Sequence, residues 1–512
     1  MFQSRSAKVI ILSSGQALTA LVGVVSMAVL TRVFSKADYA TYRQTFLAYA
    51  FAVPFVTLGL DRALYYFLPS ERQRPRGILV ENLVLLALAG LLLGAFILCG
   101  GNDLLARRLN NPGLATALLL LAPYPLLLLP AASFSGCMMA RDRTGQVAAF
   151  NVGSRLVMLA LVLLPVLIWT CPSAAIIGTV VGAGVTTIAA LILMFRACSG
   201  GPWQPTASGM AAQVRFAVPL GLASLVGSLS LSLDQVLVSM RCSPETFAVY
   251  SVGAMEIPLI GMVTGSITAV VLVDYARYYR EGRISEMVEL IHRAMVRSAV
   301  FLIPSMAFLL CVAPDLMRTL FGQKYEESAT PFRVYLLLLP VRAITFGAIL
   351  QATGRSRHVL VASVLTLAAN ASIGWLAIGW LGPTGAALAS VAAVYLVCVP
   401  YQMTIIRSTL DVPVRRMFPW RELVRVTAAT VVPSAATLAI LMVLPLASII
   451  RLVISGVTFG GLLLAILAMT GLVQLSSMVK IPWALFGTLS RRYRAIGGSP
   501  LQAMCERPGQ LR

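Results

Sequence analysis

Charge is scarce in this chain. Charged residues make up 12% of the 512 positions, whereas soluble domains carry about 25%. Hydrophobic residues account for 58%, and the mean hydropathy is +0.86. A chain of this composition would aggregate in water, so we expect lipid to be its solvent. Long polar stretches are lacking as well, which leaves no room for a soluble catalytic domain.

Residues that commonly carry catalysis or bind metals are few. Neither of the two histidines, His292 and His358, belongs to a recognisable catalytic constellation, and no P-loop is present. None of the eight cysteines forms a C-x-x-C pair, so we predict no disulfide framework and no metal site. We therefore expect no enzyme activity and no cofactor. The cysteines are Cys99, Cys137, Cys171, Cys198, Cys242, Cys311, Cys398 and Cys505.

Acidic residues are also few, with 19 against 40 basic ones, and the net charge is +21. The basic residues form short clusters between apolar runs, as juxtamembrane anchors do. No basic stripe with interleaved aromatic residues occurs, so we do not expect nucleic acid as a partner.

Apolar runs long enough to span a bilayer recur from end to end. A hydrocarbon core about 30 Å thick needs about 20 apolar residues per helix. The sequence therefore predicts an all-α polytopic membrane protein with about fourteen transmembrane helices. The predicted helices lie near 9–30, 43–68, 78–99, 116–138, 147–170, 174–195, 213–239, 248–273, 295–313, 331–352, 358–380, 383–406, 424–444 and 450–474.

The distribution of lysine and arginine predicts the orientation. With a cytoplasmic N-terminus, 27 of the 40 basic residues fall in inner segments and 10 in outer loops. Both termini are then cytoplasmic, and the number of helices is even. The outer loops are short, which argues against a sugar polymerase or ligase, because such an enzyme needs a sizeable loop or domain for its chemistry.

Two short matches indicate an internal repeat. Residues 37–42 resemble residues 245–250 at an offset of 208, and residues 141–143 resemble residues 355–357 at an offset of 214. Chance similarity is the alternative for matches this short. Six predicted helices separate the copies, so both halves enter the membrane in the same direction. This predicts two parallel six-helix lobes around a central cavity.

The repeat also predicts the domains. The first lobe covers residues 1–196, the second covers residues 213–410, and residues 411–512 add two helices and a basic cytoplasmic tail. The helix near 9–30 has a counterpart in the second half, so we interpret it as a retained helix and not as a signal peptide.

Six charged residues within predicted helices are candidates for a functional role, because a charge at mid-membrane costs about 2.5–3.5 kcal/mol. Three are arginines, and the guanidinium fork of arginine binds phosphate well. They predict a cationic cavity for an anion such as a diphosphate on a lipid carrier. The alternative is that they reach the interface or tie helices together. We expect Arg62 and Arg155 near the inner ends of their helices and Arg342 deeper.

The other three are carboxylates, Asp61, Asp234 and Glu256. They are candidates for coupling to a cation or proton, with a structural salt bridge as the alternative. Asp61 and Arg62 are adjacent, so on an α-helix they would not face each other. The basic segment 275–297 is predicted to include an amphipathic interfacial helix that contacts anionic lipid.

Several motifs carry a resemblance to a known family, over roughly residues 1–410. They are residues 14–18, 30–34, 38–42, 58–64, 232–235, 249–251, 313–316, 320–325, 351–355 and 382–387. Together they resemble the polysaccharide (O-antigen) flippases of the multidrug/oligosaccharidyl-lipid/polysaccharide (MOP) exporter superfamily. The chain departs from the opening signature at Phe34-Ser35, where that family usually has leucine-glycine. The motifs identify the superfamily better than the substrate.

The resemblance implies alternating access and a substrate, undecaprenyl-diphosphate-linked oligosaccharide, the precursor of a polysaccharide or of lipopolysaccharide O-antigen. The substrate would move from the cytoplasmic to the periplasmic face of the bacterial inner membrane. Membrane lipids and glycosyltransferases or a polymerase of the same pathway are the implied partners. One alternative is a multidrug or cation antiporter of the same superfamily, whose cavity should be acidic. Another is a scaffold of a polysaccharide assembly complex that does not transport.

Overall fold

The chain is helical throughout the part that the structure describes. The structure, a computed structural model, describes residues 5–70 and 73–470, and no strand occurs in these ranges. The predicted all-α fold is therefore confirmed. The end of the last predicted helix and most of the predicted basic tail, residues 471–512, lie outside the described residues.

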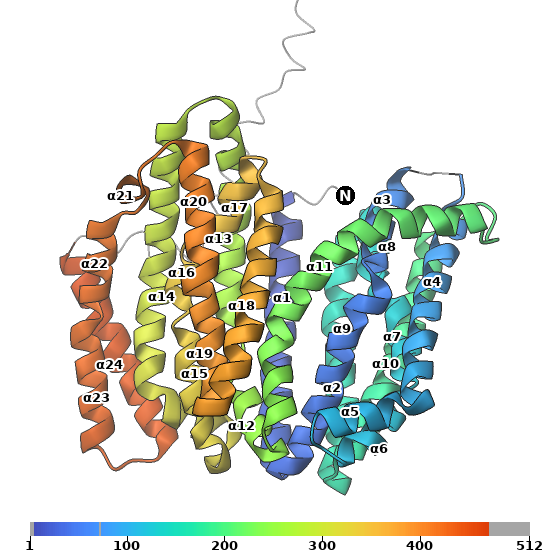
Figure 1. Ribbon diagram of the computed structural model, residues 1–512, viewed down its shortest axis with the longest axis horizontal. Helices are drawn as coiled ribbons and strands as arrows, with labels where there is room; N and C mark the ends of the chain where they lie inside the picture. The colour runs from blue at the N-terminus through green and yellow to red at the C-terminus, as the bar shows by residue number, and fades with distance from the viewer. Residues whose placement is uncertain (1–4, 71–72, 471–512) are drawn as a thin grey trace, which may run out of the picture.

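A first group of helices forms one side of the molecule (Figure 1). Within it, α1 and α10 both pack against α9, and α4 packs against α7. Proline occupies the first turn of α4 and α10, where its missing N–H has no helical partner to lose. The members are α1 (Arg5–Val33), α2 (Lys36–Thr57), η1 (Leu60–Arg62), α3 (Ala63–Ser70), α4 (Pro75–Phe96), η2 (Ile97–Gly101), α5 (Asn102–Arg108), α6 (Gly113–Leu121), α7 (Tyr124–Ala132), α8 (Phe134–Ala140), α9 (Thr144–Trp169) and α10 (Pro172–Ala197).

A second group lies beside the first, and α18 packs there against both α11 and α19, while α13 packs against α14 and α17. We call the two groups lobe 1 and lobe 2. The members of lobe 2 are α11 (Ala207–Arg241), α12 (Pro244–Gly253), α13 (Pro258–Arg280), α14 (Ile284–Phe321), η3 (Gln323–Ser328), α15 (Ala329–Leu336), α16 (Leu339–Arg342), α17 (Phe346–Ala352), α18 (Ser356–Leu381), α19 (Pro383–Ala393), η4 (Val394–Cys398) and α20 (Val399–Leu410).

The last helices form a hairpin on the far side of lobe 2, at the left edge of Figure 1. They are α21 (Val414–Met417), α22 (Trp420–Ala429), α23 (Val431–Val443) and α24 (Ser448–Met469). Both α23 and α24 pack against α14. Arg451 of α24 forms an ion pair with Asp315 of α14, whose side chain is 8% exposed. This buried pair attaches the hairpin to lobe 2.

Nine helices in the described part of the chain are long and apolar enough to cross a membrane, and the number is thirteen if each bent pair counts as one span. The predicted polytopic membrane protein is confirmed. The exact count of fourteen stays a prediction. Helix α1 is not among the thirteen, because its described apolar stretch, Leu18–Val33, is shorter than a full span.

Two structural features support the internal repeat. Ser35 caps α2 by accepting a hydrogen bond from the backbone N–H of Asp38, and Ser243, 208 positions later, caps α12 in the same way through Thr246. A second pair of equivalents is a bend inside a span. The span from α6 to α8 bends by 52° after Leu121, and the span from η3 to α17 bends by 43° after Leu336. These bends are 215 positions apart, close to the offsets found in the sequence.

Several predicted helices are interrupted in the structure, and the one near 116–138 divides into α6, α7 and α8. The helix predicted near 43–68 bends by 68° between α2 and α3, where Leu58 and Gly59 have positive φ angles of 41° and 80°. The helix predicted near 248–273 is broken by four non-helical residues, 254–257. The helix predicted near 331–352 divides into α15, α16 and α17. The predictions of continuous helices were wrong here because apolar length alone does not reveal a local break.

The basic segment 275–297 also differs from its prediction. Helix α13 continues to Arg280 and α14 begins at Ile284, so the segment extends two spanning helices through a tight turn. A separate interfacial helix does not form. We call the end of the molecule that carries this turn the basic end, and the end that carries the α1–α2 turn at residues 34 and 35 the opposite end.

Helix α11 belongs to both lobes. It runs diagonally across Figure 1 and bends by 44° between Leu222 and Ser224. Its second part packs against α18 and its first part against α3 and α4. Gly59 and Gly221 allow the first part of α11 to approach lobe 1 closely. A Cβ on Gly221 would lie 2.0 Å from the carbonyl carbon of Leu58. The prediction starts lobe 2 at residue 213. In the structure, the residues of α11 from 213 up to the bend still pack against lobe 1.

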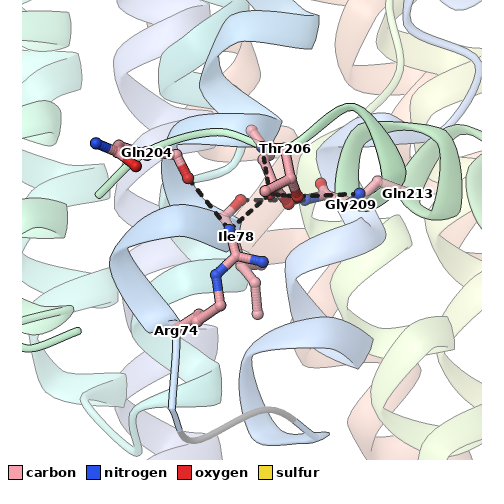
Figure 2. A network of polar contacts seen from close by, with 7 residues as sticks. Arg74, Ile78, Gln204, Thr206, Gly209 and Gln213 are labelled. Atoms are coloured by element: carbon pink, nitrogen blue, oxygen red, sulfur yellow. Dashed lines mark hydrogen bonds and ion pairs between the residues drawn. The ribbon is translucent and has the colours of Figure 1, made fainter. Parts of the chain in front are cut away.

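A polar network fastens the beginning of α11 to lobe 1 (Figure 2). At its centre is Glu81 of α4, which is 1% exposed. Its Oε1 accepts hydrogen bonds from the backbone N–H (3.0 Å) and hydroxyl (2.7 Å) of Thr206, the residue that caps α11. Arg74 Nη2 lies 3.3 Å from the same carboxylate, and Gln213 Nε2 lies 3.4 Å from Oε2. These donors compensate the burial of the charge.

Candidate functional site

Four of the six charged residues predicted inside helices lie where a membrane span is interrupted. Asp61 and Arg62 lie in the short turn η1, Glu256 lies in the non-helical stretch 254–257, and Arg342 ends α16. Interrupted backbone at membrane depth is tolerated only where it is buried in protein or lines a wet cavity. Breaks of this kind mark binding sites in many transporters. The sequence found the charges but not the breaks.

Arg342 and Glu256 form an ion pair between two of these breaks. Arg342 Nη1 lies 2.6 Å from Glu256 Oε1, and the two side chains are 37% and 61% exposed. Exposed charges in spanning segments face a wet space and not lipid, because lipid cannot solvate them. We therefore expect this pair to face water on the surface of lobe 2. An anionic ligand at Arg342 would have to compete with Glu256.

Arg62 and Asp61 lie on lobe 1 and contact each other. Arg62 Nε is 3.9 Å from Asp61 Oδ2, and the side chains are 55% and 39% exposed. The prediction that these neighbours do not face each other was wrong, because it assumed an α-helix and the chain forms the turn η1 here. A pair this exposed contributes little stability.

Arg155 lies deeper than predicted. It is eleven residues after Thr144, the first residue of α9, or about 16 Å along the helix. The expected place near the inner end was wrong because α9 begins earlier and runs 26 residues. The side chain is exposed and lies near Tyr42 and Tyr124.

Arg43 is a residue that sequence reasoning missed. The helix predicted near 43–68 would begin at Arg43, but α2 begins at Lys36, so Arg43 lies in its second turn. The Ser35-x-x-Asp38 cap was the signal that could have found this start. Its Nε is buried and has no hydrogen-bond partner among the described residues. Arg43 also lies near Tyr42, so Arg43 and Arg155 approach the same part of lobe 1.

Asp234 is enclosed by two tyrosines. It lies in the second part of α11 and is 6% exposed. Tyr250 of α12 donates a hydrogen bond of 2.9 Å to Asp234 Oδ2, and Tyr335 of α15 donates to the same oxygen. The two tyrosine hydroxyls are 2.7 Å apart. The cluster joins three helices of lobe 2 around one buried carboxylate, and no salt bridge to it occurs among the described residues.

Polar contacts join the lobes at the opposite end. Lys324 of η3 donates hydrogen bonds to the carbonyls of Arg32 and Phe34, where α1 ends. Lys36 Nζ lies 3.8 Å from Glu327 Oε2. A second set of contacts crosses between α2 and α11: Gln44 Nε2 donates to Ser239 Oγ at 2.7 Å. Positive charge at a helix C-terminus is favourable. These contacts close this end of the interface between the lobes.

The charged groups in the described part of the chain do not gather into a metal site. Among the described residues, no group of three or more His, Cys, Asp or Glu side chains could hold a metal ion. The arrangement instead offers exposed arginines on both lobes and, in Asp234, a buried carboxylate whose side-chain hydrogen bonds come from tyrosines. This chemistry suits reversible binding of an anion, with a separate acid group able to hold a proton or a cation.

Comparison with known proteins identifies the family. The family model described as "Polysaccharide biosynthesis protein" matches residues 6–273, which is more than half of the chain. The chain belongs to this family. A comparison with curated protein sequences gave no match.

The fold of this family member resembles that of solved MOP superfamily transporters. It is similar to the structure of the lipid II flippase MurJ in an inward closed conformation, with a TM-score of 0.74 and 14% identity, covering 90% of this chain and 98% of that one. It is also similar to an inward-facing multidrug resistance transporter of the MATE family, with a TM-score of 0.61 and 15% identity, covering 77% and 96%. A MOP superfamily transporter from Pyrococcus furiosus gives a TM-score of 0.55 and 13% identity, covering 80% and 97%. These similarities show that the chain has the fold expected from the motifs.

Proposed function

We propose that this protein is a flippase that carries undecaprenyl-diphosphate-linked oligosaccharide from the cytoplasmic to the periplasmic face of the bacterial inner membrane. The observation that carries the proposal is the set of exposed arginines within spanning segments, on lobe 1 at Arg62 and Arg155 and on lobe 2 at Arg342. Guanidinium groups on both sides of the interface could hold a diphosphate while the lobes alternate. The product would serve assembly of a polysaccharide or of lipopolysaccharide O-antigen.

The basic end is the cytoplasmic end in this proposal, and both termini are cytoplasmic. The contacts of Lys324 and Lys36 then close the periplasmic end, so the described conformation would receive substrate from the cytoplasm. Glycosyltransferases or a polymerase of the same pathway would supply the substrate and consume the product.

We propose Asp234 as the group that couples transport to a proton or a cation. Of the three carboxylates predicted for this role, Glu256 is held by Arg342 at 2.6 Å and Asp61 contacts Arg62 at 3.9 Å. Asp234 has two phenol donors instead of a cationic partner. A buried carboxylate without a basic partner gains most from binding a positive charge. Asp234→Asn should therefore abolish the dependence of transport on an ion gradient, whereas Asp61→Asn should preserve it.

A transport assay in proteoliposomes tests the proposal. The probe is a fluorescent undecaprenyl-diphosphate sugar, and the measurement is the fraction that a membrane-impermeant quencher can reach with time. Wild type should move the probe between leaflets. Absence of movement with and without an ion gradient would overturn the flippase and favour the scaffold. Movement of a cationic dye but not of the lipid would favour the antiporter.

A charge exchange distinguishes a ligand-binding arginine from a structural one. If Arg342 only holds Glu256, the variant R342E/E256R keeps the ion pair and should restore transport that R342E loses. If Arg342 binds the diphosphate, the exchanged variant stays inactive, and Glu256→Gln keeps or increases transport because it removes a competitor. We expect the second result, with at least about a tenfold loss for R342E, comparable to the loss of one charge-assisted contact.

A further inference from the structure

Two cysteines far apart in the sequence meet at the basic end of lobe 1. Cys137 lies in α8, and Cys198 directly follows α10. Their Sγ atoms are 3.4 Å apart, and both residues are fully buried. A disulfide has an S–S distance of about 2.05 Å, so an approach of about 1.4 Å would suffice to form the bond. The other five cysteines in the described part of the chain have no such contact with each other.

The position of Cys198 provides access to a small oxidant. It is the last residue before the exposed stretch 199–205, which leads to Thr206 and α11. We call residues 199–206 the strap. Gly200 and Gly201 follow at positive φ angles of 110° and 72°, in a conformation that glycine adopts without cost. The end of a helix beside such a stretch opens more easily than its middle, because few contacts hold it.

The surroundings of Cys198 favour its reactive form. Hydrogen bonds from the Cys137 thiol and from the Arg141 side chain lower the pKa of Cys198, and the charge of nearby Arg143 adds to this effect. The thiolate is the nucleophile in cysteine oxidation. Cys137 is the neighbouring thiol that can resolve the oxidised product.

We propose that Cys137 and Cys198 are a reversible dithiol–disulfide pair, which a peroxide oxidises and which joins the start of the strap covalently to α8. The Cys198 thiolate attacks one peroxide oxygen, the O–O bond breaks, and the departing hydroxide takes up a proton to leave as water. The sulfur of Cys137 then attacks the Cys198 sulfenic acid. The S–S bond forms, the S–O bond breaks, and the hydroxyl leaves as water with the thiol proton. Two thiols and one peroxide give one disulfide and two waters, with two electrons passing to the peroxide.

The pair has a structural consequence. The strap is already fastened at its far end, where Thr206 bonds to Glu81. The disulfide would fasten its near end as well, within lobe 1. Such a bond in the cytosol would be transient and respond to oxidants, because that compartment keeps thiols reduced.

The test uses the full-length protein in nanodiscs, with Cys505→Ser to remove the cysteine outside the described residues. The protein is reduced, freed of reductant, treated with graded hydrogen peroxide, alkylated and digested. The amount of each cysteine peptide is measured by mass spectrometry. We expect a linked Cys137–Cys198 peptide that thioredoxin reverses. Cys99, which is exposed, is the internal control. At the peroxide dose that links Cys137 to Cys198 in half of the molecules, the oxidised fraction of Cys99 should be at least about tenfold smaller, as for an ordinary thiol.

Two further results decide the proposal. In Cys137→Ser, Cys198 should accumulate as sulfenic acid that a dimedone probe captures, because the resolving thiol is gone. In the Cys505→Ser protein, with all other cysteines present, oxidation of Cys99 at lower peroxide than Cys137 and Cys198, without a linked peptide, would overturn the proposal. Equal conversion of Cys198 to sulfinic acid with and without Cys137 would also overturn it and leave the two thiols as core packing.

Discussion

At the scale of single residues, burial makes Glu81 more important for stability than any exposed carboxylate. It is 1% exposed and accepts hydrogen bonds from donors on the strap and on α11. Removing one partner of a buried charged network leaves the others without hydrogen bonds, which costs more than the network itself contributes.

We predict that Glu81→Leu lowers the free energy of unfolding by about 3 kcal/mol, in the range found for broken buried ion pairs. Thermal unfolding in detergent measures the change. The matched control is Glu289→Leu, because Glu289 is 66% exposed and contacts Arg293 at 3.8 Å; its effect should stay below about 0.5 kcal/mol. Equal effects of the two substitutions would contradict the assigned role of Glu81.

The ion pair between Arg451 and Asp315 gives a second prediction at this scale. The pair is largely buried, with 18% and 8% of the side chains exposed. Arg451→Met should destabilise the protein by about 3 kcal/mol, because it leaves the Asp315 carboxylate buried without its partner. The double variant D315L/R451M should recover most of this loss. A double-mutant cycle in thermal unfolding measures the coupling, and additive losses would show that the two side chains act independently.

At the scale of helices, glycine decides how closely α11 approaches lobe 1. A Cβ at position 221 would meet the backbone of Leu58 at 2.0 Å, whereas a Cβ at position 227 of the same helix would meet nothing within 4 Å. Backbone cannot move aside as a flexible side chain can, so only the first position requires glycine.

We predict that Gly221→Ala destabilises the protein by about 1–3 kcal/mol through overpacking. Gly227→Ala in the same helix should be neutral or slightly stabilising, because alanine is the better helix former. Both are measured by thermal unfolding. A neutral Gly221→Ala would mean that α11 moves away from Leu58 without cost, which would contradict the tight contact between its first part and lobe 1.

Sequence reasoning predicted the helices well and their interruptions poorly. The positions of Asp61, Glu256 and Arg342 within apolar runs were visible, because charge stands out there. The breaks beside them were not, because the chain has 27 prolines and 39 glycines, and tertiary contacts decide which of these interrupt a helix. The contact of Cys137 with Cys198 and the network around Glu81 could not be predicted from spacing either. They join segments more than 60 positions apart.

At the scale of the whole molecule, the contacts at the opposite end should open during transport. The ion pair of Lys36 and Glu327 crosses between the lobes, whereas that of Arg318 and Glu326, at 2.7 Å, lies within lobe 2. Alternating access requires the first pair to separate and leaves the second unchanged.

We predict that linking K36C to E327C with a reducible bifunctional thiol reagent stops lipid transport, and that reduction restores it. Linking R318C to E326C should have no effect. Both pairs are introduced into a background without native cysteines, and transport is measured in the proteoliposome assay. Undiminished transport through the linked K36C/E327C protein would contradict movement of the lobes at this end.

The serine caps of α2 and α12, 208 positions apart, bear on the ancestry of the chain. They fit a chain in which a six-helix unit was copied and the two copies were joined. A unit with six spans begins and ends on the same side of the membrane, so two copies can be fused head to tail without adding or inverting a helix. A short connection such as the strap between α10 and α11 would be enough, because it joins two ends on the same side.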